Sequence, residues 1–320
     1  MSIKNSFQIS LPRTCRINRN DSCGSWSKCF IFLSFILINI SCATISHVSA
    51  EGEFPAVYPL IENINPQWQH FTGGVGYFHG KTENPRLEFW AIKVDLRAEN
   101  ISIVTGAGAA NSGSSLSTRV SSFVRGNNLV AGINALPFDI NTTAEGQPIQ
   151  NIGIVISNGA LLSPANRYYD ALVFYKTEDH DEAAPRAAIV SQSSIGSAEN
   201  IENAVGGFHK ILAGGNPAQR TVNNDARHPR SAAGVSTNGD FLYLLVIDGR
   251  RTGSVGSTER ETALILSALG SHNGINLDGG GSSALAMRFQ DGIVRTVNTP
   301  VNIFPGQERA VAGCIGIRAD

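Results

Sequence analysis

The chain has 320 residues, of which 42% are hydrophobic and 16% are charged, as in an ordinary globular protein. Its 25 lysines and arginines nearly balance its 26 aspartates and glutamates, so the charge argues against a nucleic-acid partner. A glycine count of 33 against 13 prolines indicates a turn-rich protein with many strands.

The first fifty residues have a different composition from the rest. Five basic residues and one acid precede an apolar run of about twelve residues, Cys29 to Ile40, which is shorter than the ~20 that span a bilayer. Small residues follow at Val48-Ser49-Ala50. This pattern is typical of a secretory signal, so we expect cleavage after Ala50 and an exported protein, periplasmic or secreted, without a membrane span. Lipid attachment at Cys42 is the alternative, disfavoured because Asn39 stands where such sites take an aliphatic residue.

Removal of the leader changes the charge and the cysteine content. The 25 basic residues lose five and the 26 acidic residues lose one, which leaves 20 against 25. Cys314 is then the only cysteine, so no intramolecular disulfide can form. A chain of about 270 residues can instead bury a core large enough to stabilise it.

The elements expected in the first half follow a proline-containing, irregular lead-in over 51–84. Alternating and apolar runs predict strands at 87–96 and 101–104, and a loop of small residues covers 106–115. A helix is expected at 116–124 and a buried strand at 129–135, which delivers Asn134.

In the second half, strands are expected at 152–156 and 171–175, and strand ends at 204–208 and 211–215. A polar loop at 223–229 leads to Arg230. The runs 232–236 and 241–247 are joined by Asn238-Gly239, a preferred hairpin turn.

The clearest helix covers 258–269. Thr258 and Glu261 fit a capping box, and Gly270 follows as a stop signal. Closing strands are expected at 294–297 and 310–317. Most strands follow one another without room for a crossover helix, so the prediction is a single α+β domain over 85–320, with mostly antiparallel curved sheets and a few packed helices.

One stretch combines an apolar strand with a glycine-rich turn: Asn276-Leu277-Asp278-Gly279-Gly280-Gly281-Ser282-Ser283. Glycines are costly to order in a strand, so they indicate a turn whose backbone approaches something closely. A plain hairpin turn is the alternative reading of Asp-Gly.

Several kinds of site find no support in the sequence. No His/Cys cluster has zinc-ligand spacing, no Gly-x-Ser-x-Gly motif occurs, and the glycine turn lacks the Gly-Lys-Ser/Thr ending of a phosphate-binding loop. What remains is a set of carboxylates, which suit glycosidic-bond chemistry, and isolated arginines, which suit a phosphate.

Taken in order, these motifs resemble the phosphodiester glycosidase family over roughly residues 85–318. The matching segments are Asn276 to Ser283, Glu261 in the preceding helix, Arg230 to Gly234, Asp248-Gly249, and Arg309-Ala310-Val311. Where the family has Asn-Gly-Gly-Phe-Phe, this chain has Asn134-Ala135-Leu136-Pro137-Phe138. If this segment lines the pocket, the sugar or leaving group accepted here would differ.

The resemblance implies hydrolysis of the bond between a sugar's anomeric carbon and a phosphodiester oxygen. Asp278 and Glu261 are the catalytic candidates. The substrate-binding candidates are Arg230, Arg309, Asn134, Asn276, Gly279, Gly280, Gly281, Ser282, Ser283 and Asp248. The expected substrate is a sugar-1-phosphodiester or a phosphate-containing glycan, and no cofactor is expected.

Structural roles compete with these assignments. Asp278 could cap the turn, Glu261 could serve only the capping box, and the arginines could form ion pairs. His228 is read as a loop residue, and Trp68, Trp90 and Tyr168-Tyr169 as core rather than sugar-stacking residues. Calcium held by Asp139, Asp248 and Asp278 is a minority option. A metal-dependent phosphodiesterase and a non-catalytic exopolysaccharide-binding protein remain alternative functions.

Overall fold

The computed structural model describes residues 64–319 except 107–108, 112, 140–143, 177–184, 197–198, 223 and 225. All of them belong to one unit of the chain, Glu53–Asp320. The predicted signal segment 1–50, with Cys42, lies outside the described residues. Within the described part, no helix has the length and apolar character needed to cross a membrane.

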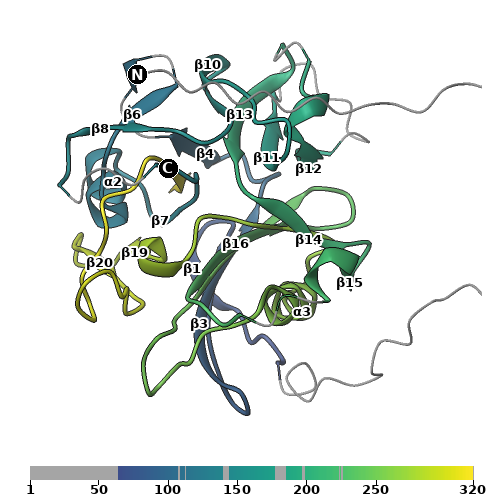
Figure 1. The fold of residues 1–320 in the computed structure, drawn as a ribbon, viewed down its shortest axis with the longest axis vertical. Coiled ribbons are helices and arrows are strands. Elements are labelled where there is room, and N and C mark those ends of the chain that lie inside the picture. Colours follow the sequence, from purple (N-terminus) through teal and green to yellow (C-terminus); the bar gives the residue numbers. More distant parts are fainter. Residues whose placement is uncertain are drawn as a thin grey trace, which may run out of the picture. The chain divides into compact units, whose positions relative to one another are not determined.

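The described residues form four β-sheets and two α-helices, α2 (Val120–Gly126) and α3 (Glu259–Leu269) (Figure 1). The strands within each sheet pair antiparallel throughout, as in the pairs β2–β3, β16–β17, β11–β13 and β21–β7. The expectation of mostly antiparallel sheets with few helices is therefore confirmed.

The largest sheet has eight strands, and the hairpin expected around Asn238-Gly239 lies at its centre. Gly239 has φ 75°, the left-handed conformation, and the loop lies between Ser236 and Phe241, so it is longer than the two residues expected. Across the sheet the order is β1 (Gln69–Thr72), β2 (Val75–Glu83), β3 (Arg86–Asp95), β17 (Phe241–Ile247), β16 (Arg230–Val235), β18 (Asn273–Asn276), β14 (His209–Ala213) and β15 (Asn216–Pro217).

Part of the lead-in expected to be irregular, 51–84, is instead regular, because β1 and β2 lie within it. β2 pairs with β3 from Val75 opposite Val94 to Glu83 opposite Arg86. Only Val75 and Gly80 of β2 are buried, so the strand carries almost no alternation of apolar and polar residues. Its partner strand, not its own sequence pattern, determines its structure.

Three smaller sheets complete the fold. One has the order β10 (Ala160–Ser163), β9 (Val155–Ser157), β13 (Ile201–Gly206), β11 (Asp170–Tyr175) and β12 (Ala187–Ser191). Another has the order β20 (Val294–Thr296), β19 (Leu285–Arg288), β7 (Ala131–Asn134), β21 (Cys314–Ala319) and β4 (Ile101–Gly106). The last has the order β5 (Ala109–Asn111), β6 (Ser114–Leu116) and β8 (Pro148–Gln150).

The boundaries of several predicted elements are wrong. The helix expected at 116–124 begins at Val120, because residues 114–116 pair with β8. Arg119 provides no side-chain cap, and the backbone N–H of Ser121 donates instead to Glu308, 187 positions away. The expected loop 106–115 contains β5 and part of β6, the strand expected at 152–156 is β9, and the closing strand begins at Cys314 rather than 310. The start of α2 could not be predicted because its capping residue, Glu308, is distant in sequence and leaves no local signal.

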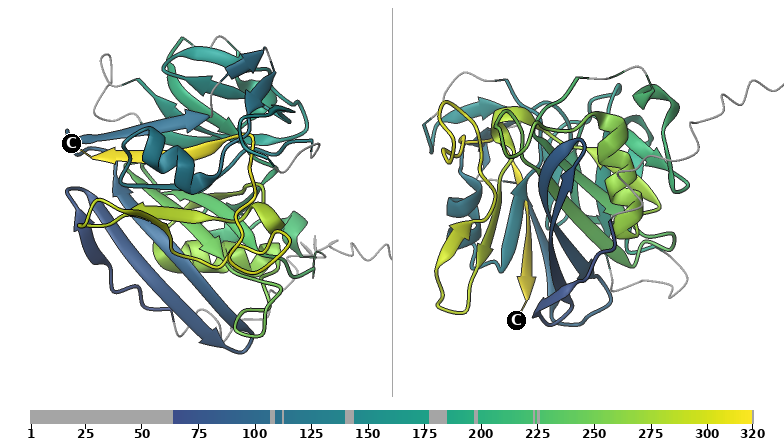
Figure 2. Two further views of the ribbon diagram at one scale, coloured as in Figure 1. Left: turned by 90° about the vertical axis from the view of Figure 1, so that its left-hand side faces the viewer. Right: turned by 90° about the horizontal axis from the view of Figure 1, so that it is seen from below.

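Apolar side chains on the eight-stranded sheet alternate between two cores. Leu242, Leu244 and Val246 of β17 belong to the core that the sheet shares with the two five-stranded sheets. Tyr243 and Leu245 face the other core, formed with α3. Both views of Figure 2 show α3 beside the green strands of this sheet. The central strands β16 and β17 are therefore buried on both faces, which fixes the strand ends that carry polar residues.

The predicted start and stop of α3 are confirmed. Thr258 Oγ1 accepts a hydrogen bond from the Glu261 N–H at 3.1 Å, and Glu261 Oε2 accepts one from the Thr258 N–H at 2.9 Å. Gly270, with φ 109°, ends the helix in the left-handed conformation.

Candidate functional site

The glycine-rich turn lies where the chain passes from one sheet to another. β18 ends at Asn276 in the eight-stranded sheet, and the next strand, β19, belongs to a five-stranded sheet. Between them, Gly280–Ser282 form a short 3₁₀ turn in which Gly280 has φ 62°. Because β18 and β19 do not pair, the alternative of a plain hairpin turn is wrong.

Backbone hydrogen bonds hold this turn against neighbouring strand ends. The Asp278 N–H donates to the Ala135 carbonyl at 2.9 Å, and the Gly280 N–H donates to the Pro229 carbonyl at 2.8 Å. The N–H groups of Ser282 and Ser283 are used within the turn. These amides are thus not free for a ligand, contrary to what the glycine pattern suggested for Gly280.

Asn134 fastens the turn from the end of β7. Its Nδ2 donates to the Asp278 carbonyl at 2.5 Å, and its Oδ1 accepts from the Ser231 hydroxyl at 2.6 Å and the Ala284 N–H at 3.1 Å. The side chain is fully buried, and both of its polar ends are occupied. Asn134 therefore positions the turn, whereas the sequence predicted a contact with the sugar.

A cavity of about 290 Å³ opens beside the turn, and we call it the arginine pocket. It is small beside the usual range for ligand pockets, ~300–1,000 Å³. Three arginines contribute to its lining, and none of the lining residues is acidic. The lining residues are Phe208, His228, Arg230, Arg250, Asn276, Gly279, Gly280, Gly281 and Arg309.

Arg230 is the buried arginine of the pocket, only 7% exposed. Its Nε donates to the Ser257 carbonyl at 3.1 Å and its Nη2 to the Ala226 carbonyl at 3.0 Å. Glu259 lies 3.7 Å from Nη1, an ion pair at the edge of contact distance. Burial lowers the pKa of Arg230, although Glu259 acts in the opposite direction. The guanidinium is thus fixed largely by neutral carbonyl groups.

Arg309 and Arg250 lie against glycines of the turn. A Cβ atom on Gly281 would overlap Nη2 of Arg309, and one on Gly280 would lie 3.3 Å from Nη2 of Arg250. Arg309 donates to Asn302 Oδ1 at 3.0 Å and Ser282 Oγ at 3.3 Å. Among the described residues, no carboxylate lies within ion-pair distance of either arginine. The glycines thus leave room for the two guanidinium groups to lie against the turn.

Asp278 adjoins the pocket without lining it. Burial raises the pKa of Asp278 to about 6, while the Ser282 hydroxyl, Arg309 and the Gly279 amide favour the charged form. Its Oδ2 atom is buried and has no hydrogen-bond partner among the described residues. The same holds for Asn276 Oδ1 and Ser283 Oγ. Unpaired buried polar atoms are rare in folded proteins, so these three atoms make the turn a candidate binding segment.

Glu261, predicted to be catalytic, is occupied elsewhere. Its carboxylate accepts hydrogen bonds from Arg227 at 2.6 and 2.8 Å, besides its capping bond to Thr258. It is 5% exposed and does not line the arginine pocket. The capping role of Glu261 is confirmed, and its catalytic role stays a prediction.

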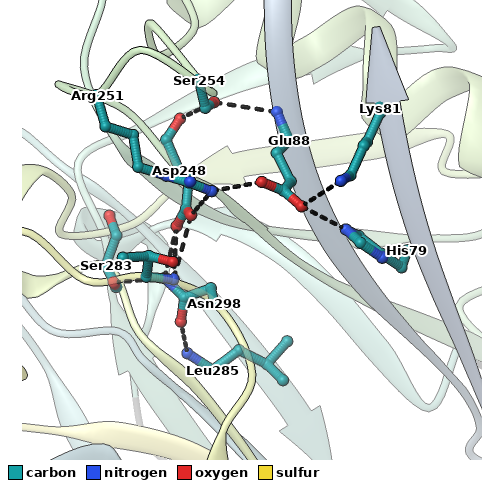
Figure 3. A network of polar contacts seen from close by, with 10 residues as sticks. His79, Lys81, Glu88, Asp248, Arg251, Ser254, Ser283, Leu285 and Asn298 are labelled. Atoms are coloured by element: carbon teal, nitrogen blue, oxygen red, sulfur yellow. Dashed lines mark hydrogen bonds and ion pairs between the residues drawn. The ribbon is translucent and has the colours of Figure 1, made fainter. Parts of the chain in front are cut away.

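Asp248, predicted to bind substrate, is also absent from the pocket lining. It is 1% exposed, and Figure 3 shows its carboxylate facing Asn298 and Arg251. Burial raises the pKa of Asp248, and the hydrogen bond from Asn298 and the charge of Arg251 only partly oppose this. The hydrogen bonds of the Asp248 carboxylate thus go to other groups of the protein, Asn298, Thr299 and Arg251.

Arg250, His228 and Phe208 line the pocket but were not predicted to do so. Arg250 follows Asp248-Gly249 directly, so the motif pointed to it, and its φ of 59° marks a strained position. Burial, Arg230 and Arg250 lower the pKa of His228, which favours its neutral form. The Phe208 ring meets Tyr169 edge-on at 5.4 Å. For His228 and Phe208, no sequence signal distinguished the residue from loop and core residues.

Two further expectations concern residues away from the pocket. Ala135 and Leu136, at the departure from the family motif, are fully buried and do not line it. Trp90 is core, as expected, and stacks on His79 at 4.8 Å. In the described part of the chain, no three His, Cys, Asp or Glu side chains gather as metal ligands would.

Comparison with known families and structures adds independent findings. A family model described as phosphodiester glycosidase matches residues 127–318, a segment that contains every residue of the arginine pocket. No curated protein sequence matches the chain.

Several solved structures share the fold. The catalytic domain of zebrafish N-acetylglucosamine-1-phosphodiester alpha-N-acetylglucosaminidase, auto-inhibited by its pro-peptide, is 19% identical with a TM-score of 0.58, covering 80% of this chain and 89% of that one. A hypothetical protein from Synechocystis is 15% identical with a TM-score of 0.55, covering 81% and 64%. A putative exported protein from Burkholderia pseudomallei is 15% identical with a TM-score of 0.55, covering 72% and 74%. At these identities the likeness concerns the fold alone.

Proposed function

The chain belongs to the phosphodiester glycosidase family, and from that premise we propose that it hydrolyses a sugar-1-phosphodiester. The bond broken joins the anomeric carbon to a phosphodiester oxygen, and the products are a free sugar and a phosphomonoester. One observation carries most of the proposal: three arginines surround a glycine-rich turn next to a carboxylate whose pKa is raised to about 6.

The arginine pocket would hold the phosphate. A guanidinium binds phosphate oxygens through two parallel hydrogen bonds, and Arg250 and Arg309 have no described carboxylate competing for them. The phosphomonoester leaves as an anion, so negative charge grows on it as the glycosidic bond breaks. Fixed positive groups stabilise such charge more in the transition state than in the ground state. This would lower the barrier without a proton donor for the leaving group.

Asp278 would act on the sugar side of the bond. With a pKa of about 6 it is mostly ionised at neutral pH, yet it is a stronger base than an ordinary aspartate. Its buried Oδ2 has no hydrogen-bond partner among the described residues, so a rearrangement that opens it to the pocket would let it accept a proton from water or attack the anomeric carbon. Ordinary glycosidases need a second carboxyl group as acid. A phosphate leaving group removes that need, in keeping with Glu261 being engaged with Arg227.

The proposal extends to substrate class and location. A GlcNAc-1-phosphodiester or a phosphate-containing exopolysaccharide or cell-envelope glycan fits an anion pocket bordered by an aromatic residue, Phe208. The basic leader and its short apolar run support export to the periplasm or beyond. The acidic balance of the chain after residue 50 supports a partner other than nucleic acid.

Turnover of a panel of sugar-1-phosphodiesters in ¹⁸O-labelled water tests the proposal. We expect the label in the released sugar, and loss of turnover but not of phosphate binding in Asp278→Asn. Label in the phosphate would instead establish a phosphodiesterase. Phosphate or glycan binding by the wild type, with no turnover of any panel member, would establish a non-catalytic binding protein. Asp139→Asn, an exposed aspartate away from the pocket, is the control.

A further inference from the structure

Two of the three arginines in the pocket come from loops. Arg250 lies just after β17, and Arg309 lies in the segment between β20 and β21. Arg309 is steadied by Asn302 of its own segment, at 3.0 Å. Whether the two guanidinium groups can reach one phosphate therefore depends on how the two loops are held relative to each other and to the glycine turn.

A single buried carboxylate joins these two loops. Asp248 stands two positions before Arg250, and its Oδ1 accepts hydrogen bonds from Asn298 Nδ2 at 2.9 Å and the Thr299 N–H at 3.1 Å. Its Oδ2 accepts from Thr299 and from Arg251. Because residues 298–299 lead into the segment of Asn302 and Arg309, Asp248 connects the loop of one arginine to that of the other.

Asn298 connects the same junction to the glycine turn. Its Nδ2 also donates to the Ser283 carbonyl at 3.1 Å, and its Oδ1 accepts from the Leu285 N–H at 2.8 Å (Figure 3). The residue is 7% exposed. Both ends of its amide are thus used, and three segments that reach the pocket meet at this side chain.

The junction is in turn fixed to the eight-stranded sheet. Arg251 bridges Asp248 and Glu88 of β3, and Glu88 also lies 3.0 Å from both His79 and Lys81 of β2. Ser254 Oγ donates to the Asp248 carbonyl at 2.6 Å and accepts from the Glu88 N–H at 3.0 Å. Figure 3 shows this chain of contacts from Lys81 and His79 to Asn298. The loops are therefore tied to rigid strands.

We propose that Asp248 and Asn298 are positioning residues for anion binding, forming a clamp that holds Arg250 and Arg309 at the separation that suits one phosphate group. The inference rests on the proposed function in that it takes phosphate as the anion. It gives Asp248 an indirect role in place of the direct substrate contact predicted from sequence, and it assigns Asn298, which carries no sequence motif, to the site.

The test compares Asn298→Leu with a matched control, Asn203→Leu, in the full chain. Asn203 is also buried, at 2% exposure, and also has three hydrogen bonds, to Ile103, Thr105 and Asn158, but it does not line the arginine pocket. Binding of inorganic phosphate is measured by calorimetry at a temperature where circular dichroism shows all variants folded. We expect at least a tenfold weaker affinity for Asn298→Leu and less than a twofold change for Asn203→Leu. The isosteric variant Asp248→Asn should behave like Asn298→Leu.

The outcomes separate the clamp from the enzymatic proposal. Equal loss of phosphate affinity in the Asn298 and Asn203 variants would mean general loosening and would overturn the clamp. So would unchanged affinity in both Asn298→Leu and Asp248→Asn, or a wild type that binds no phosphate. If the wild type binds phosphate and Asn298→Leu does not, yet no sugar phosphodiester is turned over, the clamp stands and the proposed hydrolase does not.

Discussion

Replacing Asp278 by asparagine should stabilise the protein at neutral pH, while removing the group proposed to be catalytic. The folded pKa is about 6, raised from an ordinary value of 3.8 by burial. A rise of about two pH units corresponds to about 3 kcal/mol at ~1.4 kcal/mol per unit. That is the free energy that the folded state loses when it must carry this carboxylate ionised rather than protonated.

The direction of the pH effect on stability follows from the number of protons that the folded and unfolded states bind. Between the unfolded and folded pKa values the folded state binds more protons, so stability falls as pH rises through this window. Most of the change, about 2 kcal/mol, is expected between pH 4.5 and 7.5 for these pKa values. The side-chain amide introduced by Asp278→Asn does not titrate, so the variant lacks this loss.

The assay is urea denaturation of the wild type and Asp278→Asn at both pH values. The difference in unfolding free energy between variant and wild type should be more favourable to the variant at pH 7.5 than at pH 4.5 by about 2 kcal/mol. Other titrating groups are common to both proteins and cancel. Any packing defect of the amide changes the unfolding free energy of the variant by the same amount at both pH values. A difference that is the same at the two pH values would refute a raised pKa at Asp278.

Three further predictions concern the residues around the pocket. Glu261→Gln keeps a side chain suited to the capping box and should retain turnover. Glu261→Ala should lower the unfolding free energy by about 1–2 kcal/mol in thermal or urea denaturation. A hundredfold loss of turnover in Glu261→Gln would show that the carboxylate is catalytic after all. Gly281→Ala should displace Arg309 and weaken phosphate binding about tenfold, the loss expected for one charge-assisted contact. Gly126→Ala adds a methyl group with nothing near it and should leave phosphate binding unchanged. Equal calorimetric affinities of the two variants for phosphate would contradict the packing of Arg309 on the turn. Sulfate affinity should fall severalfold as pH rises through about 6, because Asp278 becomes negative beside Arg309. Asp278→Asn should keep only a weaker pH dependence, which comes from His228, has the same sign and lies at lower pH. An unchanged pH profile of sulfate affinity in the variant would exclude Asp278 as its cause.

The local parts of the fold were predictable because their signals are local. The hairpin around Asn238-Gly239 and the helix α3 depend on turn residues and on a capping box that lie close in sequence, and both elements occur where expected. The start of α2 depends on Glu308, and β2 depends on pairing with β3. Neither dependence is visible in a short window of sequence.

The same division applies to the site. The glycine turn, Arg230, Arg309 and Asn276 came from motifs, and the structure places them around one cavity. Asn134 and Asp248 also lie in motifs, but hydrogen bonds from other segments occupy their side chains. Motif position alone does not tell a side chain that faces a ligand from one that holds the residues that do.

The pairing of β3 with β17 has a practical consequence for anyone who prepares this protein in pieces. The recognisable family segment begins at residue 127, yet Phe89 to Asp95 of β3 cover β17 along its whole length, and β4 covers β21. A fragment cut at the family boundary would leave β17 as an open edge with apolar side chains on both faces. Such an edge recruits other chains. The fragment should therefore aggregate, and it would also lack Glu88, which anchors the clamp of Asp248 and Asn298.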